Sequence, residues 1–163
     1  MSEPIQPQPQ PQVDTQWQRE GPSGPRASFG RRLAALLLDY LIVSVAGLVV
    51  VFIFVLIDES LLGVGFAFWF FAFLAYSIYF VGGPSGQTPG RRALGIRVID
   101  FRTGGPIGYG RAALRYVGSL ISGWFCYLGY LWMLWDGEKQ TWHDKMANSV
   151  VVPIHFYPVD NWP

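Results

Sequence analysis

The stretch at residues 33–81, LAALLLDYLIVSVAGLVVVFIFVLIDESLLGVGFAFWFFAFLAYSIYFV, decides the fold class. It contains two apolar runs, residues 33–57 and 61–81, separated by a short polar break of Asp58, Glu59 and Ser60. At about 1.5 Å per residue, each run is long enough for a helix to cross the roughly 30 Å hydrocarbon core of a bilayer. A soluble domain of this size has no core large enough to hide both runs. We therefore predict an antiparallel transmembrane hairpin.

The overall composition is also typical of a membrane protein. Charged residues make up 14% of the 163-residue chain and hydrophobic residues 51%, whereas a soluble domain has about a quarter charged residues. Aromatic residues reach 17%, and Trp and Tyr favour the membrane interface. The net charge of +1 points to no particular partner, and we expect no nucleic acid. The single cysteine, Cys126, lies in an apolar run and is predicted to be a small buried hydrophobe.

Polar segments lie at both ends of the predicted membrane domain. Residues 1–28 are poor in aliphatic side chains and rich in Pro and Gln, so we expect a disordered, cytoplasmic tail. We assign residues 29–155 to the membrane domain and residues 156–163 to a short C-terminal tail.

The loop at residues 82–110 contains a strand signal. Residues 94–100 (LGIRVID) alternate roughly and are rich in β-branched side chains, and residues 102–105 (RTGG) are typical of a turn. We predict a small β-hairpin-like cytoplasmic loop at the membrane surface.

A third apolar run, residues 112–135, is interrupted by Arg115, Gly118, Gly123 and Gly129. It either crosses the bilayer once or breaks at Gly123 and re-enters, and the balanced charges that follow it do not decide between these forms. The predicted fold class is an all-α polytopic membrane protein. It consists of the hairpin plus a third apolar helix, for which a broken or re-entrant form stays open.

Basic residues lie on one side of the predicted hairpin. They precede the first apolar run and follow the second: Arg19, Arg26, Arg31, Arg32, Arg91, Arg92, Arg97, Arg102 and Arg111. The break between the runs has none, so the positive-inside bias predicts a cytoplasmic N-terminus and a cytoplasmic loop. We also expect the lipid bilayer to provide anionic head groups that bind at Arg31, Arg32, Arg91 and Arg92.

Asp39 is the candidate functional residue with the strongest physical argument. A carboxylate about two turns into a membrane helix costs about 2.5–3.5 kcal/mol on insertion scales, so it is usually paired, protonated or beside a polar path. Arg32 lies on nearly the same helix face. Seven residues rise about 10.5 Å, however, which would strain a direct salt bridge within one straight helix. Arg32 is therefore either an orientation charge or part of a polar site, and both interpretations stay open.

His143 and Asp144 form a second polar feature. Thr141 and Asp144 match the spacing of a helix capping box, so a purely structural role at the start of a helix stays open beside a functional one. Only one other histidine, His155, is present and no Cys/His cluster accompanies it, so we expect no metal. The loop at residues 83–91 lacks the Gly-Lys-[Ser/Thr] of a phosphate loop, and no nucleophile motif occurs. We expect no cofactor and no enzymatic activity.

Three motifs stand at the start of the first helix, in the basic loop and near the C-terminus. They are Phe29-x-x-Arg32-x-x-Ala35-x-x-x-Asp39, Gly86-Gln87-Thr88-Pro89-Gly90-Arg91-x-x-x-Gly95-Ile96-Arg97-Val98, and Thr141-Trp142-His143-Asp144-Lys145 followed by Ser149-Val150-Val151-Val152. Together they resemble the RDD family of bacterial membrane proteins, over about residues 29–152. The Pro/Gln-rich tail is similar to that of the proline-rich-antigen type of member.

The RDD family is named for one arginine and two aspartates. The resemblance implies that these residues are Arg32, Asp39 and Asp144 here. His143, Arg91 and Arg97, which belong to the same motifs, are supporting candidates. If the three named residues cluster, Asp144 must approach the first helix, which favours the broken form of the third run.

The resemblance further implies a small helical domain in a bacterial plasma membrane, for which ligand transport or cation/proton exchange has been suggested. In a transport hypothesis, Asp39 binds a cation or proton while Arg32 and Asp144 tune its charge. Three spans are few for such a path, so a homo-oligomer would be needed. The alternative is a membrane scaffold or accessory subunit, in which the same residues lock helix packing and the tail or basic loop recruits a partner.

Overall fold

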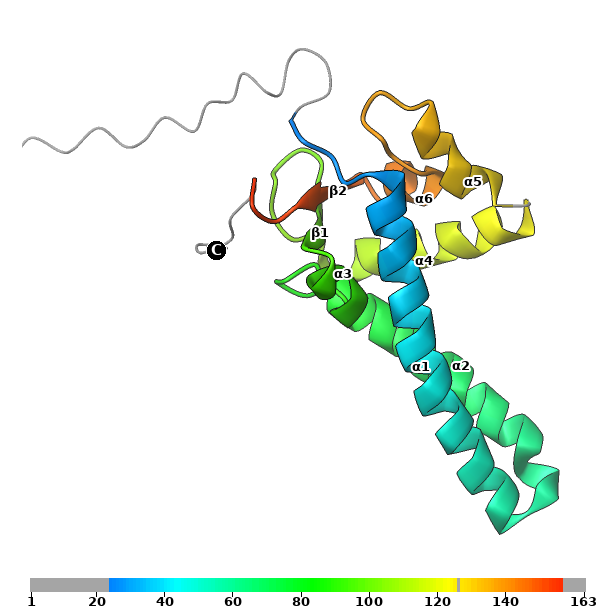
Figure 1. Ribbon diagram of the computed structural model, residues 1–163. Coiled ribbons are helices and arrows are strands. Elements are labelled where there is room, and N and C mark those ends of the chain that lie inside the picture. The colour runs from blue at the N-terminus through cyan, green and yellow to red at the C-terminus, as the bar shows by residue number, and fades with distance from the viewer. Residues whose placement is uncertain (1–23, 126, 157–163) are drawn as a thin grey trace, which may run out of the picture.

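The computed structural model describes residues 24–125 and 127–156 and is mostly helical (Figure 1). In chain order its elements are α1 (Phe29–Ile57), η2 (Glu59–Leu61), α2 (Leu62–Gly82), α3 (Pro89–Ala93), β1 (Ile96–Asp100), α4 (Gly108–Trp124), α5 (Leu128–Leu131), η3 (Trp132–Leu134), α6 (Trp142–Met146) and β2 (Ser149–Pro153). The predictions made for residues 1–23, Cys126 and residues 157–163 lie outside the described residues. Helices α1 and α2 form a long hairpin, and the elements after α2 gather as a second layer at one end of it (Figure 1).

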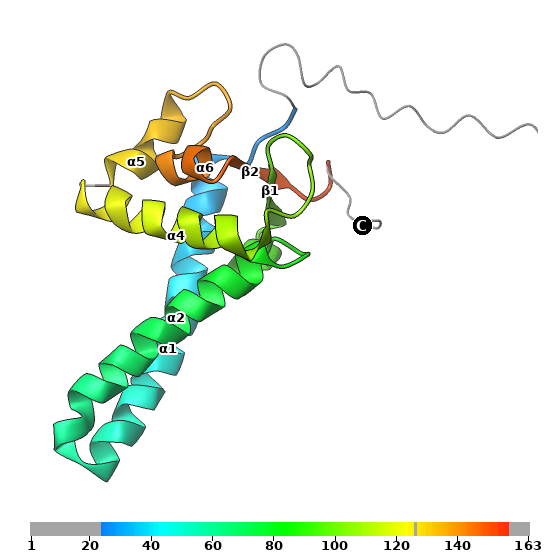
Figure 2. The same cartoon turned by 180° about the vertical axis from the view of Figure 1, so that it is seen from behind.

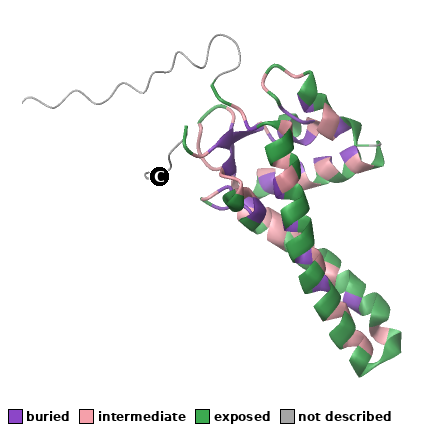
Figure 3. Ribbon diagram, in the orientation of Figure 1, coloured by how far each residue is buried: buried purple, intermediate pink, exposed green. Residues whose placement is uncertain are grey.

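The predicted hairpin is present, and both of its helices are long and apolar enough to cross a membrane. The buried residues of α1 recur at every fourth position, at Ala35, Asp39, Val43 and Gly47, so only a narrow stripe of this helix is covered (Figure 3). Trp69 of α2 packs against Gly47 and donates its indole N–H to the carbonyl of Val43 at 3.1 Å. The outer surface of the hairpin is almost entirely apolar, which suits contact with lipid.

The two strands come from distant parts of the chain. β1 pairs antiparallel with β2 in a register that sets Val98 opposite Val151. The prediction of a β-hairpin-like loop within residues 82–110 is therefore wrong, because β1 pairs with a strand that lies outside this loop. After β1 the chain closes a tight turn instead, in which the carboxylate of Asp100 accepts hydrogen bonds from the backbone N–H groups two and three residues later. Every residue of β1 and β2 is buried, so β1 needs a partner strand that tolerates burial, and β2 is such a strand.

The segment before α1 lies extended against β2. The backbone N–H of Ala27 donates to the carbonyl of Val151 at 3.0 Å, and Ala27 is buried. Arg26 forms an ion pair of 2.6 Å with Glu138. Arg26 and Ala27, which we assigned to the tail, are thus in contact with the folded layer. Both ends of the described chain lie at the same end of the hairpin (Figure 1).

The third apolar run is bent, as the broken form predicts. Helix α4 and the short helices α5 and η3 meet at an angle of 112°. The break lies just beyond Gly123, where Tyr127 adopts a left-handed backbone with φ 59°. The run therefore does not continue as one straight helix.

Helix α4 has two unlike faces. Its buried face is made of small and polar residues, Ala112, Arg115, Gly118 and Ser122. Its exposed face is made of large apolar residues, Leu114, Val117, Leu120, Ile121 and Trp124. In both views α4 crosses the hairpin near the end of α2 rather than running alongside it (Figures 1 and 2). This two-sided surface is typical of a helix that lies along a membrane interface.

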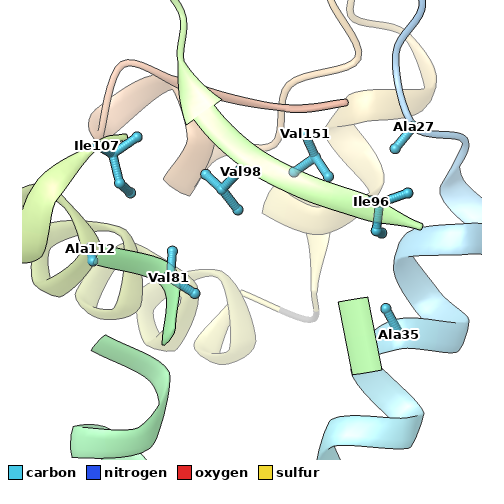
Figure 4. Close-up of a cluster of buried hydrophobic side chains, with 8 residues drawn as sticks. All are labelled: Ala27, Ala35, Val81, Ile96, Val98, Ile107, Ala112 and Val151. Atoms are coloured by element: carbon cyan, nitrogen blue, oxygen red, sulfur yellow. The ribbon is translucent and has the colours of Figure 1, made fainter. Parts of the chain in front are cut away.

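A core of small and aliphatic side chains joins the two layers where the sheet meets the ends of α1 and α2 (Figure 4). Its members are Ala27, Ala35, Val81, Ile96, Val98, Ile107, Ala112 and Val151. At the junction of α2 and α4, Gly82 lies so close to Tyr109 that an added Cβ would come within 2.7 Å of its backbone Cα. The core thereby holds α4 and the two strands over the end of the hairpin, and helices α3 and α6, which directly precede these strands, are positioned with them.

Candidate functional site

Asp144 is the centre of a buried ion cluster contributed by three helices. Its carboxylate accepts a hydrogen bond of 2.8 Å from Nη1 of Arg32 in α1 and pairs with Nη1 of Arg115 in α4. The same guanidinium nitrogen of Arg115 donates to Oγ of Ser149 at 2.7 Å. Thr141 and Asp144 also form the predicted capping box at the start of α6. Asp144 itself is fully buried, so the cluster ties α1, α4 and α6 together away from water.

The electrostatics of Asp144 follow from its two cationic neighbours. Burial alone would raise the pKa of this carboxyl, but the charges of Arg115 and Arg32 outweigh burial and hold its pKa well below the ordinary value. Two guanidinium groups therefore share one ionised carboxylate in a site of low polarity. Removing that carboxylate would leave two buried positive charges without compensation.

Asp39 occupies a second, separate centre. Its carboxylate accepts hydrogen bonds from the hydroxyl of Tyr76 at 3.0 Å, the hydroxyl of Thr88 at 2.5 Å and the backbone N–H of Gly90 at 2.7 Å. A Cβ at Gly90 would collide with this carboxylate and with the carbonyl of Ala35, so the close approach of α3 to α1 requires glycine. Asp39 thus clamps the loop before α3 and helix α2 onto α1.

The three residues named by the family resemblance fall into two groups. Arg32 contacts Asp144, which is the approach that the broken third run was expected to permit. Among the described residues, the hydrogen-bond partners of Asp39 are all uncharged groups, and Arg32 is not one of them. Arg32 and Asp39 both line one cavity, which brings the two groups together.

This cavity has a volume of about 260 Å³ and lies between α1, α3 and the bent third run. Its charged wall consists of Arg32, Asp39, Arg91 and Arg115. Its apolar and aromatic wall consists of Phe29, Leu33, Leu36, Tyr127, Tyr130, Leu131 and Met133, completed by Thr141, His143 and Val151. Leu33 and Leu36 are 41% and 46% exposed, so this wall continues onto the outer surface of the hairpin.

Two side chains at this cavity each have one buried nitrogen without a hydrogen-bond partner in the described part of the chain. They are Arg91, at its buried Nη1, and His143, at its buried Nδ1. Burial lowers the pKa of Arg91 to about 10, with the neighbouring charge of Arg115 acting in the same direction. Burial likewise lowers the pKa of His143 to about 3, so its imidazole is neutral at physiological pH. Arg91 can therefore donate to a ligand that enters the cavity, and the neutral imidazole of His143 can donate or accept.

The remaining predicted residue, Arg97, is buried on β1 and does not line the cavity. Arg115, by contrast, was treated in the sequence only as an interruption of the third apolar run. The sequence did contain a signal for Arg115, because a lone arginine in an apolar helix is as unusual as Asp39 and needs a partner.

Across residues 24–125 and 127–156, no group of three or more His, Cys, Asp or Glu side chains is arranged to hold a metal ion.

Comparison with known proteins covers most of the folded region. Residues 26–148 match the sequence profile described as the RDD family. The chain is 34% identical over 98 residues to the proline-rich antigen of Mycobacterium leprae, which covers 56% of this chain and 39% of that protein. It is 35% identical over 83 residues to a proline-rich antigen homolog of Mycobacterium tuberculosis, which covers 51% of this chain and 35% of that protein. The chain thus spans less than half the length of these relatives, and no solved structure matches it.

We predict that Asp144→Asn destabilises the protein by about 3–5 kcal/mol, because it leaves the buried guanidinium groups of Arg32 and Arg115 uncompensated. The matched control is Asp136→Asn, which removes a carboxylate whose partner, Lys145, is 45% exposed and can be solvated. This control should cost less than Asp144→Asn, because an asparagine oxygen can still accept the hydrogen bond from the backbone N–H of Gln140 and the freed Lys145 is solvated. Thermal unfolding of both variants in detergent measures the difference, and equal stability of the two would contradict the buried cluster.

We also predict that the protein loses stability as the pH falls from 6.5 to 4.5. The unfolded chain protonates His143 near pH 6.5, whereas the folded chain resists protonation until about pH 3 because the pKa of the buried ring is lowered. The unfolded state then binds more protons, which lowers the free energy of unfolding by at most about 1.4 kcal/mol per pH unit. In His143→Phe this slope should flatten. An unchanged slope in the variant would show that His143 is not the group responsible.

Proposed function

This chain belongs to the RDD family, and from that premise we propose that it is a multi-pass protein of a bacterial plasma membrane that binds a small ligand at the cytoplasmic ends of its membrane helices. The observation that carries the proposal is the cavity of about 260 Å³ at the junction of the hairpin and the polar layer. Its volume is close to the lower end of the roughly 300–1,000 Å³ range of ligand sites. It also combines an apolar wall with a few converging polar groups, as such sites do.

The distribution of charge supports a cytoplasmic position for the polar layer. Every described lysine and arginine lies at the end of the hairpin that carries the sheet, and the opposite tip carries Asp58 and Glu59. The positive-inside bias then favours a cytoplasmic N-terminus. The hydrogen bond between Ala27 and Val151 argues that the C-terminal strand lies on the same side. In this arrangement α1 and α2 cross the bilayer and α4 lies along its inner interface.

Cation or proton exchange at Asp39 receives less support than ligand binding. Three hydrogen-bond donors already occupy the carboxylate of Asp39, and the cavity presents it together with the guanidinium groups of Arg32, Arg91 and Arg115. A metal cation would meet repulsion from these three groups and would have to displace the donors. We therefore favour ligand binding over transport as the function, and we assign no covalent chemistry to the site.

A second candidate function is a membrane scaffold or accessory subunit, whether as a monomer or as a homo-oligomer. The observation in its favour is that the carboxylates of Asp39 and Asp144 are both satisfied by groups of the same chain, as locked packing requires. In this role the exposed Arg31 and Arg92 would attract anionic head groups, whereas Arg32 and Arg91 are turned inward.

We expect reporter fusions to place both ends of the folded domain on the cytoplasmic side. A fluorescent protein fused after residue 156 should be bright, and alkaline phosphatase at the same point should be inactive. Alkaline phosphatase inserted at Glu59, in the hairpin tip, should be active. An active phosphatase after residue 156 would mean that the third run crosses the membrane and would overturn this topology.

We further expect the purified protein to retain a bound molecule that leaves when the cavity is filled. Leu36→Trp places an indole in the cavity wall, whereas Leu37→Trp adds the same group at a neighbouring leucine that does not line it. Native mass spectrometry from mild detergent should show an adduct on the unmodified protein and on Leu37→Trp only. Equal loading of both variants, or no adduct on any of the three, would refute ligand binding and favour the scaffold.

A further inference from the structure

The polar groups of the cavity define what kind of ligand fits it. We infer that the cavity binds a phosphate group, presented by the head of an acidic lipid whose acyl chains lie against the outer surface of α1. This inference rests on the proposed ligand cavity and names the chemical class of its ligand.

The balance of buried charge is the first argument. Three guanidinium groups, those of Arg32, Arg91 and Arg115, line the cavity. Two carboxylates oppose them: Asp39 in the cavity wall, and Asp144 behind it, where it pairs with Arg32 and Arg115. One positive charge is left over in a site shielded from water, where an uncompensated charge is costly. An anion in the cavity removes that cost, and a cation would increase it.

The second argument is the pattern of unsatisfied groups. Nη1 of Arg91 and Nδ1 of His143 are buried at the cavity without a hydrogen-bond partner among the described residues, and His143 is only 6% exposed. Arginine binds phosphate oxygens through several N–H groups at once, which suits Arg91 to this role. The charge of Asp39 repels an anion, but Arg32, Arg91 and Arg115 line the same cavity and outweigh that repulsion.

The apolar wall points to a lipid rather than a free ion as the source of the phosphate. Leu33 and Leu36 connect the cavity to the exposed surface of α1, within the first two turns of that helix. Tyr127 and Tyr130 border the same cavity, and tyrosine favours the level of the lipid head groups. An anion that bears acyl chains would place its phosphate beside Arg91 and its chains along leucines that already face lipid.

The test uses the full-length protein in a zwitterionic detergent and three probes: dioctanoyl phosphatidic acid, dioctanoyl phosphatidylcholine and inorganic phosphate. We expect phosphatidic acid to bind, phosphatidylcholine to bind at least tenfold more weakly, and inorganic phosphate not to compete at millimolar concentration. Competition by inorganic phosphate with equal affinity would overturn the lipid as the source while retaining the phosphate site. Failure of all three probes to bind would overturn the inference altogether.

Two adjacent arginines of α3 supply a matched pair of variants. Arg91→Gln removes the group that lines the cavity, and Arg92→Gln removes an equal charge from an exposed position. We expect Arg91→Gln to weaken phosphatidic acid binding at least tenfold and Arg92→Gln to weaken it less than threefold, with both variants folded as judged by thermal unfolding. Equal losses would mean attraction to a basic surface and would refute the cavity site.

Leu36→Trp separates this inference from the function on which it rests. It should abolish phosphatidic acid binding without any change of charge, and full binding by this variant would refute the site even if Arg91→Gln proved unstable. If the protein carries an adduct that Leu36→Trp removes, yet none of the three probes binds, the ligand cavity stands and its assignment to phosphate fails.

Discussion

The shared carboxylate of Asp144 is the interaction on which the polar layer depends. It lies out of contact with water and holds Arg32 of α1 and Arg115 of α4, while its own helix α6 is capped through Thr141. Pairs of this kind add little net stability, because desolvation of the charges offsets their attraction. These ion pairs instead determine how the three helices are placed, because any packing that separates the helices leaves a buried charge without a partner. The ion cluster therefore selects one placement of α4 and α6 over the end of the hairpin.

The bent course of the third apolar run follows from that constraint. A straight helix through the bilayer would carry Arg115 away from Asp144 and into surroundings where a lone guanidinium is costly. The observed α4 instead buries Arg115 with Ala112, Gly118 and Ser122 and exposes its large apolar residues on the opposite face. The bend at Tyr127 then turns α5 back toward α6, which closes one side of the cavity. The same cluster thus accounts for the bend and for the empty space beneath it.

The hairpin could be predicted from the sequence because length and apolarity act locally and need no knowledge of partners. Asp39 was also recognisable, since a carboxylate in an apolar helix must be satisfied, but its donors Tyr76, Thr88 and Gly90 are ordinary residues with no local signal. The pairing of β1 with β2 was missed because turn signals describe only neighbouring residues, whereas four further helical segments, α4, α5, η3 and α6, separate the two strands in the chain. Arg115 was overlooked although a lone arginine in an apolar run needs a partner, and the sequence alone does not identify that partner as Asp144.

The separation of these partners along the chain also governs the order in which the protein can assemble during synthesis. Thr88 and Gly90 lie 49 and 51 positions after their partner Asp39, whereas Asp144 lies 112 positions after its partner Arg32. At about 5–20 residues per second, the ribosome needs roughly 6–22 s to supply that carboxylate. Meanwhile Arg32, in the first turn of α1, can extend its guanidinium toward the head groups. The clamp on Asp39 can therefore form first, and the domain reaches its final state only when its last helix and strand leave the ribosome.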